Sequence, residues 1–288
     1  MDSNQIIQIL NGISYGLLLF MMAAGLSLVF GLMGVINMSH GSWYMIGAYT
    51  GITVMRLTGS FILAALSGGA AAALLGMAME RFFLNKLYRR TLEQVLLTFG
   101  FSYIFMDLCK WLWGRAPFSG VKPAVLEGSL QIGDASFPIY RIAIILIGLA
   151  VALALRIFLE KTRTGMIIRA GVDDKEMVSA LGINIRRYFL LVFSLGAFLS
   201  GFGGVVGAPV TGVYPGVDSD ILLLSLAVVV TGGLGTLKGA FWGSMLIGVS
   251  ETMGKIFIPG YSIVTTYVIM AILLLFKPAG LFGKGEIK

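Results

Sequence analysis

Long apolar segments separated by short charged connections run through all 288 residues of this chain. About 20 apolar residues of helix cross the hydrocarbon core of a bilayer. From Ser3 to Met55 there is no Asp, Glu, Lys or Arg, which leaves room for two crossings. The pattern predicts an all-α integral membrane protein with about nine (8–10) transmembrane helices. The other crossings are expected in Leu57–Met79, Thr91–Trp113, Pro138–Leu159, Tyr188–Val213, Ile221–Leu237, Gly239–Phe257 and Tyr261–Phe276.

The composition supports a membrane protein and excludes other classes. Hydrophobic residues make up 57% of the chain, charged residues only 12%, and the mean hydropathy is +0.91. A soluble domain carries about 25% charged residues, so soluble enzymes, disordered chains and fibrous proteins are excluded. We expect residues 1–288 to form a single transmembrane domain. The one cysteine, Cys109, excludes an intrachain disulfide.

The distribution of basic residues predicts an orientation. The chain has 21 Lys and Arg against 14 Asp and Glu. If the N-terminus lies outside, 15 of the 21 basic residues fall on the inside, and the positive-inside rule then predicts N-out/C-in. The outside keeps Arg56, Lys110, Arg115, Lys122, Arg141 and Lys255. The inside residues are Arg81, Lys86, Arg89, Arg90, Arg156, Lys161, Arg163, Arg169, Lys175, Arg186, Arg187, Lys238, Lys277, Lys284 and Lys288.

Two connections between the apolar segments are long. Residues 114–137 are expected outside, as a periplasmic loop, and residues 160–187 inside, as a cytoplasmic loop. In the inside loop, 162–165 is a polar turn, and 173–182 is a short helix with acidic residues at its start and Gly182 at its end. This helix is either solvated or covered by a partner.

The chain has 39 glycines, and many of them recur four residues apart. In lipid, this spacing lets helix backbones approach closely, so we expect most of these glycines to pack helices together. The glycines concerned are Gly12, Gly16, Gly47, Gly51, Gly203, Gly207, Gly235, Gly239 and Gly243.

Glycines meet polar residues at 31–44 and again at 231–239, each time between two apolar segments. The sequences that follow, 41–47 and 243–248, are alike, as an internal duplication would make them. Interrupted helices at matching places in two halves are typical of a transport pathway, although ordinary cytoplasmic turns have the same composition. His40 is a proton relay or a hydrogen-bonded structural residue. The candidate pathway residues are Asn37, Ser39, His40, Tyr44, Thr98, Thr231 and Thr236.

Signals for catalysis are absent from the sequence. It has no phosphate-binding loop, no metal-ligand cluster and no Ser/His/Asp set in a credible context. The pairs Asp107/Lys110 and Glu251/Lys255 each share a helix face, so we expect them to neutralise each other rather than bind an ion. We therefore expect no catalytic residue, no metal and no cofactor in this chain, and any ATPase must be another chain.

Three stretches resemble the permeases of branched-chain amino acid ABC importers, the LivH type. They are residues 25–41 (GLSLVFGLMGVINMSHG), the inside loop from Thr162 to Asn184, and residues 231–240 with Gly248 and Glu251. The resemblance implies a type II-like ABC importer permease of the bacterial inner membrane that works by alternating access. Its partners would be a LivM-type permease or a second copy, two cytoplasmic ATPases that bind ATP and Mg, and a periplasmic binding protein. No nucleic acid is implied.

The resemblance also gives the short inside helix a role, as the coupling helix that docks on the ATPase. The residues implied are Thr164, Gly165, Arg169, Asp173, Met177, Ala180, Leu181 and Gly182.

Alternatives to this function remain open. Within the same family, the substrate could be urea, amides or small carboxylates rather than branched-chain or other amino acids. Outside the family, the main alternative is an ion-coupled secondary transporter, which would need paired mid-membrane acids of which the chain has few.

Overall fold

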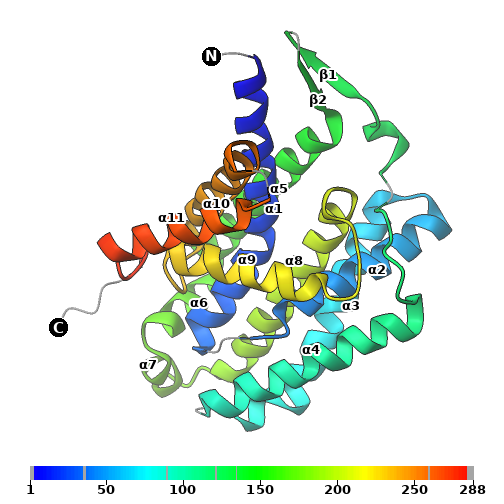
Figure 1. The fold of residues 1–288 in the computed structure, drawn as a ribbon. Coiled ribbons are helices and arrows are strands. Elements are labelled where there is room, and N and C mark those ends of the chain that lie inside the picture. Colours follow the sequence, from blue (N-terminus) through cyan, green and yellow to red (C-terminus); the bar gives the residue numbers. More distant parts are fainter. Residues whose placement is uncertain are drawn as a thin grey trace.

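The computed structural model describes residues 3–34, 37–88, 90–120, 122–133, 135–258 and 260–283. Most of them are helical, in one bundle with a single β-hairpin (Figure 1). The α-helices are α1 (Ser3–Met33), α2 (His40–Thr58), α3 (Phe61–Phe82), α4 (Thr91–Trp113), α5 (Ile139–Lys161), α6 (Arg163–Asp173), α7 (Lys175–Ala180), α8 (Ile185–Thr211), α9 (Val217–Gly232), α10 (Leu237–Phe257) and α11 (Ser262–Phe276). The short elements are the 3₁₀ turns η1 (Leu84–Lys86) and η2 (Ala124–Leu126) and the strands β1 (Ser129–Ile132) and β2 (Ala135–Pro138).

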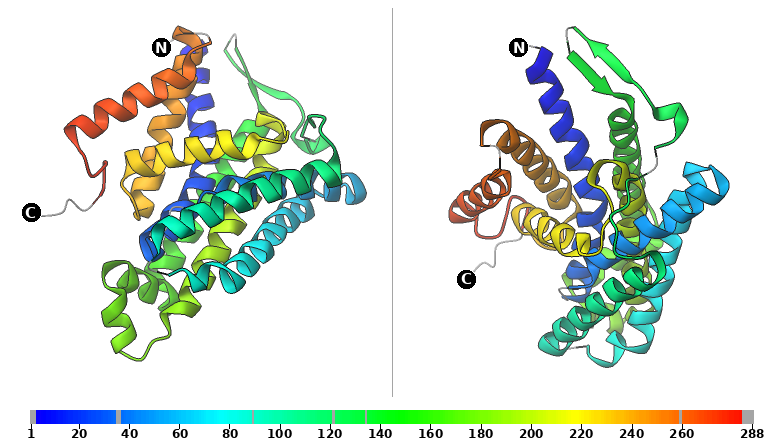
Figure 2. Two further views of the ribbon diagram at one scale, coloured as in Figure 1. Left: turned by 60° about the horizontal axis from the view of Figure 1, so that its bottom comes forward. Right: turned by 45° about the vertical axis from the view of Figure 1, so that its right-hand side comes forward.

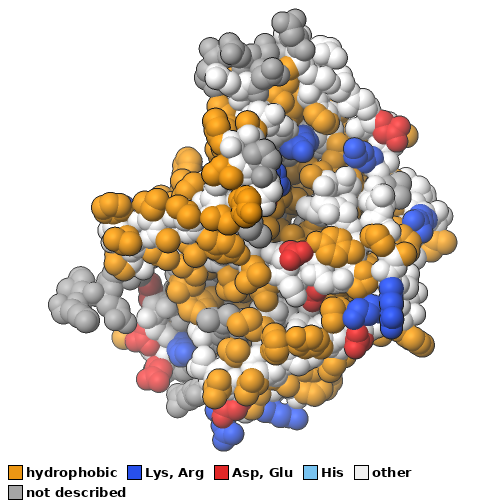
Figure 3. Space-filling model, viewed as in Figure 1, with side chains coloured by type: hydrophobic (Ala, Val, Ile, Leu, Met, Phe, Trp, Pro, Cys, Tyr) orange, Lys and Arg blue, Asp and Glu red, His pale blue; other side chains and the backbone are white. Residues whose placement is uncertain are grey.

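Two helices, α1 and α8, form the centre of the bundle. The apolar windows of α1 and α8 are 89% and 72% buried within the chain, whereas those of α3, α4 and α5 are only 33%, 17% and 22% buried. The outer helices therefore leave apolar side chains uncovered, and Figure 3 shows such side chains spread over α4, α9 and α11. Lipid or another subunit has to cover this surface, because water cannot solvate so much apolar area at low cost.

Five of the described helices are long and apolar enough to cross a membrane: α1, α3, α4, α5 and α8. Helices α9 and α10 add a sixth span if they are taken together, and they meet at a 117° bend. The expected segments 221–237 and 239–257 match these two helices, but the bend makes them one broken span or a re-entrant pair. Nine crossings and the N-out/C-in orientation both stay predictions.

The two long connections lie at opposite ends of the bundle. The N-terminus of α1 and the β1–β2 hairpin are at one end, and α6 and α7 are at the other (Figures 1 and 2). Three of the basic residues that predict the orientation, Arg89, Lys284 and Lys288, lie outside the described residues.

Three local features differ from, or refine, what the sequence predicts. The hairpin, with Ser129 opposite Pro138, departs from a purely α-helical chain. The expected polar turn at 162–165 instead begins helix α6, because the Thr162 hydroxyl accepts a hydrogen bond from Gly165 N (3.0 Å) and caps it. The expected short helix is α7, capped by Asp174, and it ends before Gly182, whose φ of +79° favours glycine.

Most of the glycines with four-residue spacing lie where two helices touch, against the backbone or a side chain of the neighbour. A Cβ on Gly47 of α2 would collide with the backbone of Gly201 in α8, and one on Gly16 of α1 would lie 2.8 Å from Ser244 O of α10. Gly12, Gly51, Gly207, Gly239 and Gly243 are equally crowded, whereas a Cβ on Gly203 would make only ordinary contacts at 3.4 Å. Close approach of this kind supplies the packing that apolar attraction cannot supply in lipid.

Candidate functional site

The two glycine-rich interruptions predicted from the sequence lie against each other. A Cβ built on Gly31, near the end of α1, would come within 2.8 Å of the Cα of Gly235, in the link between α9 and α10. Ser27 Oγ donates a hydrogen bond to Thr236 O (3.2 Å) across the same contact. Residues 35 and 36 of the first interruption lie outside the described residues. The fold thus brings together two breaks that are about 200 positions apart in sequence.

Polar side chains at the first interruption accept hydrogen bonds from its backbone N–H groups. Asn37 Oδ1 accepts hydrogen bonds from Ser39 N (3.1 Å) and Ser39 Oγ (2.7 Å), and Thr98 Oγ1 of α4 accepts one from Met38 N (3.1 Å). Asn37, Ser39 and Thr98 are all buried. Non-helical backbone at membrane depth needs such internal partners. These three candidates therefore have a structural task, and a role in a pathway stays a prediction.

His40 and Tyr44 are buried in the first turns of α2. His40 Nε2 lies 2.9 Å from Met22 O, and Nδ1 has no hydrogen-bond partner among the described residues. The Tyr44 hydroxyl lies 2.7 Å from Thr211 Oγ1 at the end of α8. This geometry favours the structural alternative for His40, because a proton relay needs a further polar group beside the second ring nitrogen.

The two threonines of the second interruption differ. Thr236 Oγ1 donates to Gly233 O (3.0 Å) and accepts from Gly239 N (3.1 Å), so it caps α10. Thr231 is fully buried, and its hydroxyl has no partner among the described residues.

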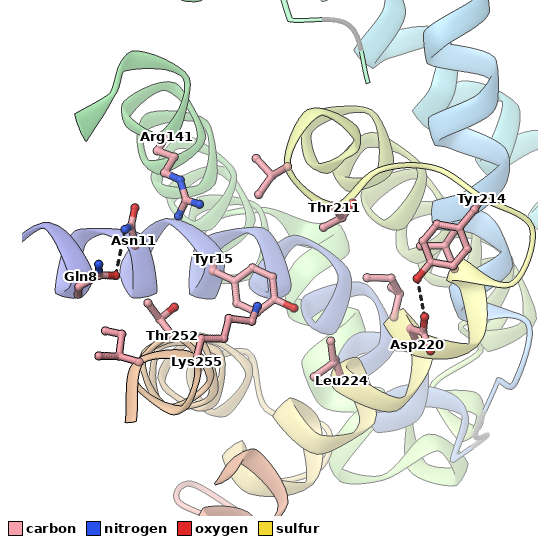
Figure 4. A pocket seen from close by; sticks show the side chains of 14 residues that line it. Gln8, Asn11, Tyr15, Arg141, Thr211, Tyr214, Asp220, Leu224, Thr252 and Lys255 are labelled. Atoms are coloured by element: carbon pink, nitrogen blue, oxygen red, sulfur yellow. Dashed lines mark hydrogen bonds between the residues drawn. The ribbon is translucent and has the colours of Figure 1, made fainter. Parts of the chain in front are cut away.

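A cavity of about 580 Å³ opens beside the N-terminal half of α1, where Gln8, Asn11 and Tyr15 line it (Figure 4). None of the seven candidate pathway residues lines it, although Thr211, the partner of Tyr44, does. Its walls come from five helices and the link between α8 and α9. The lining residues are Gln8, Asn11, Tyr15, Arg141, Val210, Thr211, Tyr214, Val217, Asp220, Ile221, Leu224, Thr252, Lys255 and Ile256.

The charged groups of the cavity have unequal partners. Lys255 Nζ pairs with Glu251 Oε1 (3.1 Å) and lies 5.2 Å from the centre of the Tyr15 ring. The Tyr214 hydroxyl donates to Asp220 Oδ2 (2.6 Å), and this hydrogen bond, with partial burial, raises the pKa of Tyr214 to about 12. Arg141 makes no ion pair within the described ranges. The cavity therefore has one cation and one anion, Arg141 and Asp220, that lack an ion pair among the described residues.

Sequence reasoning missed this site for a simple reason. It found the Glu251/Lys255 pair, which the structure confirms together with Asp107/Lys110 (2.9 Å). The only other lining residue that the sequence singles out is Arg141, as one of the basic residues expected on the outside. Nothing in the spacing of Gln8, Arg141 and Asp220 indicates that they share one cavity.

A second candidate site is the projecting pair α6–α7 at the opposite end. Met177 and Leu181 are 64% and 74% exposed, whereas Val178 is buried and holds α7 against the rest of the chain. Gly165 is buried against the backbone of Phe158 and Leu159. Thr164 is half-buried, and Arg169, Asp173, Ala180 and Gly182 are exposed. No group of three His, Cys, Asp or Glu side chains that could hold a metal occurs in the described part of the chain.

Comparison with known proteins decides the family. The family model for the permease component of branched-chain amino acid transport systems matches residues 8–277. The chain belongs to this family. It is similar to BraD, a high-affinity branched-chain amino acid transport permease of Pseudomonas aeruginosa, with 30% identity covering 98% of this chain and 96% of the relative. This membership makes the chain a transport permease rather than a catalytic enzyme.

Other relatives agree with this assignment. LivH of Escherichia coli is 28% identical, covering 98% of this chain and 96% of LivH. LivM of the same organism is 24% identical, covering 89% of this chain and 66% of LivM. Among solved structures, PsaBC from Streptococcus pneumoniae in complex with Fab matches with a TM-score of 0.53 and 14% identity, covering 94% of this chain and 92% of that one. At this identity, the structural match supports the fold alone.

Proposed function

We propose that this chain is one of two transmembrane subunits of an ATP-driven importer for branched-chain amino acids in the inner membrane of a bacterium. The support is the family, and relatives whose names give this transport activity over nearly their full length. The second subunit is a LivM-type permease or a second copy, since a LivM relative aligns with most of this chain. Two cytoplasmic ATPases bind ATP and Mg, and a periplasmic protein delivers the substrate.

The observation that carries the proposal is the exposed apolar surface of α7. Met177 in α7 and Leu181 directly after it are more than 60% exposed, which is unusual for apolar side chains on a short helix rich in charge. Asp174 accepts from Glu176 N and Met177 N (both 2.9 Å), so the helix is rigid at its start. In the proposal, Met177 and Leu181 insert into the ATPase, and charged neighbours set the register. Arg169, Asp173, Ala180 and Gly182 surround this contact, while Thr164 and Gly165 hold its base.

The remaining features follow from the same proposal. The end with α6 and α7 faces the cytoplasm, which is the N-out/C-in orientation, and residues 114–137 face the periplasm. The two permease subunits alternate between inward and outward access, and the nine-crossing topology counts α2, α9, α10 and α11 as membrane segments. The seven polar residues at and beside the helix breaks stay candidates for the pathway, next to their structural tasks.

Leu181→Glu tests the coupling surface. It places a charge in the proposed contact, so the permease should insert normally but no longer co-purify with its ATPases, and ATP-dependent uptake should fall at least tenfold. Val125→Glu is the matched control, because Val125 is 89% exposed in η2, beside the hairpin and at the opposite end of the bundle from α7 (Figure 1). If Leu181→Glu assembles with the ATPase and transports like the control, α7 is not the coupling helix.

Two further measurements separate the alternatives. A secondary transporter loses uptake when an uncoupler is added while ATP remains, and the proposed importer does not. Ligand binding by the cognate periplasmic protein distinguishes amino acids from urea, amides and small carboxylates, since selection can reside in that protein.

A further inference from the structure

The segment that follows α11, residues 277–283, lies against the C-terminal end of α9, and we call this segment the strap. Leu281 N donates a hydrogen bond to Thr231 O (2.9 Å), and Phe282 N donates one to Gly232 O (2.9 Å). The two donors and the two acceptors are 50 positions apart in the sequence. The end of α9 therefore depends on a part of the chain that comes after two further helices.

The strap and the link after α9 meet backbone to backbone. A Cβ built on Gly233, the first residue after α9, would lie 2.3 Å from Gly283 N. On the strap, a Cβ built on Gly280 would lie 2.6 Å from Gly233 N. Gly233 and Gly280 also have φ angles of +105° and +81°, which favour glycine. The fit therefore needs glycine on both sides of the contact.

The strap occupies acceptors that a continuous helix would use itself. In an α-helix, the carbonyl of each residue accepts from the N–H four positions later. For Thr231 O this donor would be Gly235 N, and for Gly232 O it would be Thr236 N. Because the helix breaks, Thr236 N instead donates to Gly233 O (3.4 Å). At membrane depth the freed carbonyls need partners inside the protein, and the strap supplies them.

The break that the strap holds is also in contact with α1. Ser27 Oγ of α1 donates to Thr236 O (3.2 Å), and a Cβ on Gly31 of α1 would lie 2.8 Å from the Cα of Gly235. The strap, the link between α9 and α10, and the end of α1 therefore form one junction. A change in the bend would move Gly235 relative to α1 and to the first interruption.

We infer that the strap is a conformational lock for the 117° bend between α9 and α10. With the strap docked, the last carbonyls of α9 are satisfied from outside the helix, and the chain stays bent. When the strap leaves, residues 233–236 continue the helix, and α9 and α10 turn toward one common axis. The bend is thus a two-state element, and the strap favours its bent state. The effect of the lock on transport rests on the proposed function, whereas its effect on the bend does not.

The first test measures the bend in the assembled importer as a distance between two spin labels. Leu223→Cys in α9 and Trp242→Cys in α10 carry the labels, because both positions are more than half exposed, and buried native Cys109 stays in place. The permease is labelled before assembly, and pulsed electron paramagnetic resonance is recorded in nanodiscs. At 1.5 Å of rise per residue, full straightening should lengthen the distance between the labelled positions by about 10 Å.

Two shortened chains form the matched pair for this measurement. A chain that ends at Gly280 lacks both donors of the strap, and it should show a second population at the longer distance. A chain that ends at Gly283 keeps both donors and loses only residues 284–288, so it should give the single short distance of the wild type.

The second test uses full-length chains and asks whether the lock matters for transport. Leu281→Pro removes one donated N–H, whereas Leu281→Ala keeps it and shortens only the side chain. Leucine taken up per ATP hydrolysed should fall at least threefold in Leu281→Pro and stay at the wild-type value in Leu281→Ala. The ratio is used because a poorly folded variant lowers uptake and hydrolysis together.

Three outcomes overturn the inference. The chain that ends at Gly280 keeps the wild-type distance, or the chain that ends at Gly283 shows the same second population, or Leu281→Pro melts at a lower temperature but keeps the wild-type ratio of uptake to hydrolysis. The last outcome would make the strap a packing element only. Absence of ATP-dependent leucine uptake by the wild-type importer refutes the proposed function instead, and the distance measurement still tests the lock.

Discussion

Polar side chains gather in two regions of this molecule, and the regions differ in whether those side chains have partners. At the first helix interruption, Asn37, Ser39 and Thr98 are buried and bonded to the backbone around them. In the cavity, Arg141 and Asp220 are more accessible and are left without an opposite charge. The comparison shows that a polar residue at membrane depth indicates function only after its structural hydrogen bonds have been counted.

The difference extends to backbone packing. Glycines let the backbones of α2 and α8 touch close to the interruption. The cavity lies where the ends of α1, α5, α8, α9 and α10 diverge. Substitutions near the interruption should therefore damage stability, and substitutions in the cavity should damage transport.

The largest effect is expected for Gly47→Ala. Its Cβ would collide with the backbone of Gly201 and force α2 and α8 apart, which should lower the free energy of unfolding by about 3 kcal/mol. The thermal midpoint of the detergent-solubilised permease, followed by size-exclusion chromatography, measures this loss.

Gly100→Ala is the matched control for that substitution. A Cβ on Gly100 in α4 meets no atom within 4 Å, and alanine favours helix by about 1 kcal/mol. Stability should stay the same or rise. Equal destabilisation by both substitutions would contradict the packing explanation.

A smaller loss is expected for Asn37→Ala. It removes the acceptor for Ser39 N and Ser39 Oγ in a buried site, and two unsatisfied donors should cost about 2 kcal/mol of unfolding free energy. The same melting assay measures it.

Asn184→Ala serves as the control, because Asn184 is exposed and makes no capping side-chain hydrogen bond to α8. If Asn37→Ala melts at the same temperature as Asn184→Ala but transports poorly, Asn37 belongs to the pathway. Its hydrogen bonds would then not be needed for stability, contrary to the role given to it above.

The smallest effect is expected in the cavity, for Tyr214→Phe. The substitution removes the hydroxyl that donates to Asp220 but keeps the aromatic ring and the charge of Asp220, so the stability of the protein should not change. Leucine uptake should fall about threefold, which corresponds to a change in free energy of less than about 1 kcal/mol. Initial uptake rates in proteoliposomes provide the measurement. Tyr261→Phe, at an exposed tyrosine outside the cavity, should transport normally.

Much of the architecture could be predicted from sequence, because the signals are local. Apolar length predicts the long helices, and the three family stretches predict the permease family. Asp174 and Gly182 mark the two ends of α7, and three- or four-residue spacing predicts the two ion pairs. Thr162 is predicted in a polar turn but caps α6, and this prediction is wrong because a threonine cap and a polar turn have the same local composition.

Other features depend on how the helices pack. The bend of 117° between α9 and α10 and the contact of Gly31 with Gly235 are not visible in any local pattern. The cavity likewise brings together residues of five helices that are far apart in the sequence. Helix periodicity, capping and charge asymmetry act over a few residues, so one chain without its relatives reveals them directly. A cavity is the space that packed helices leave, and its position follows from every contact in the bundle at once.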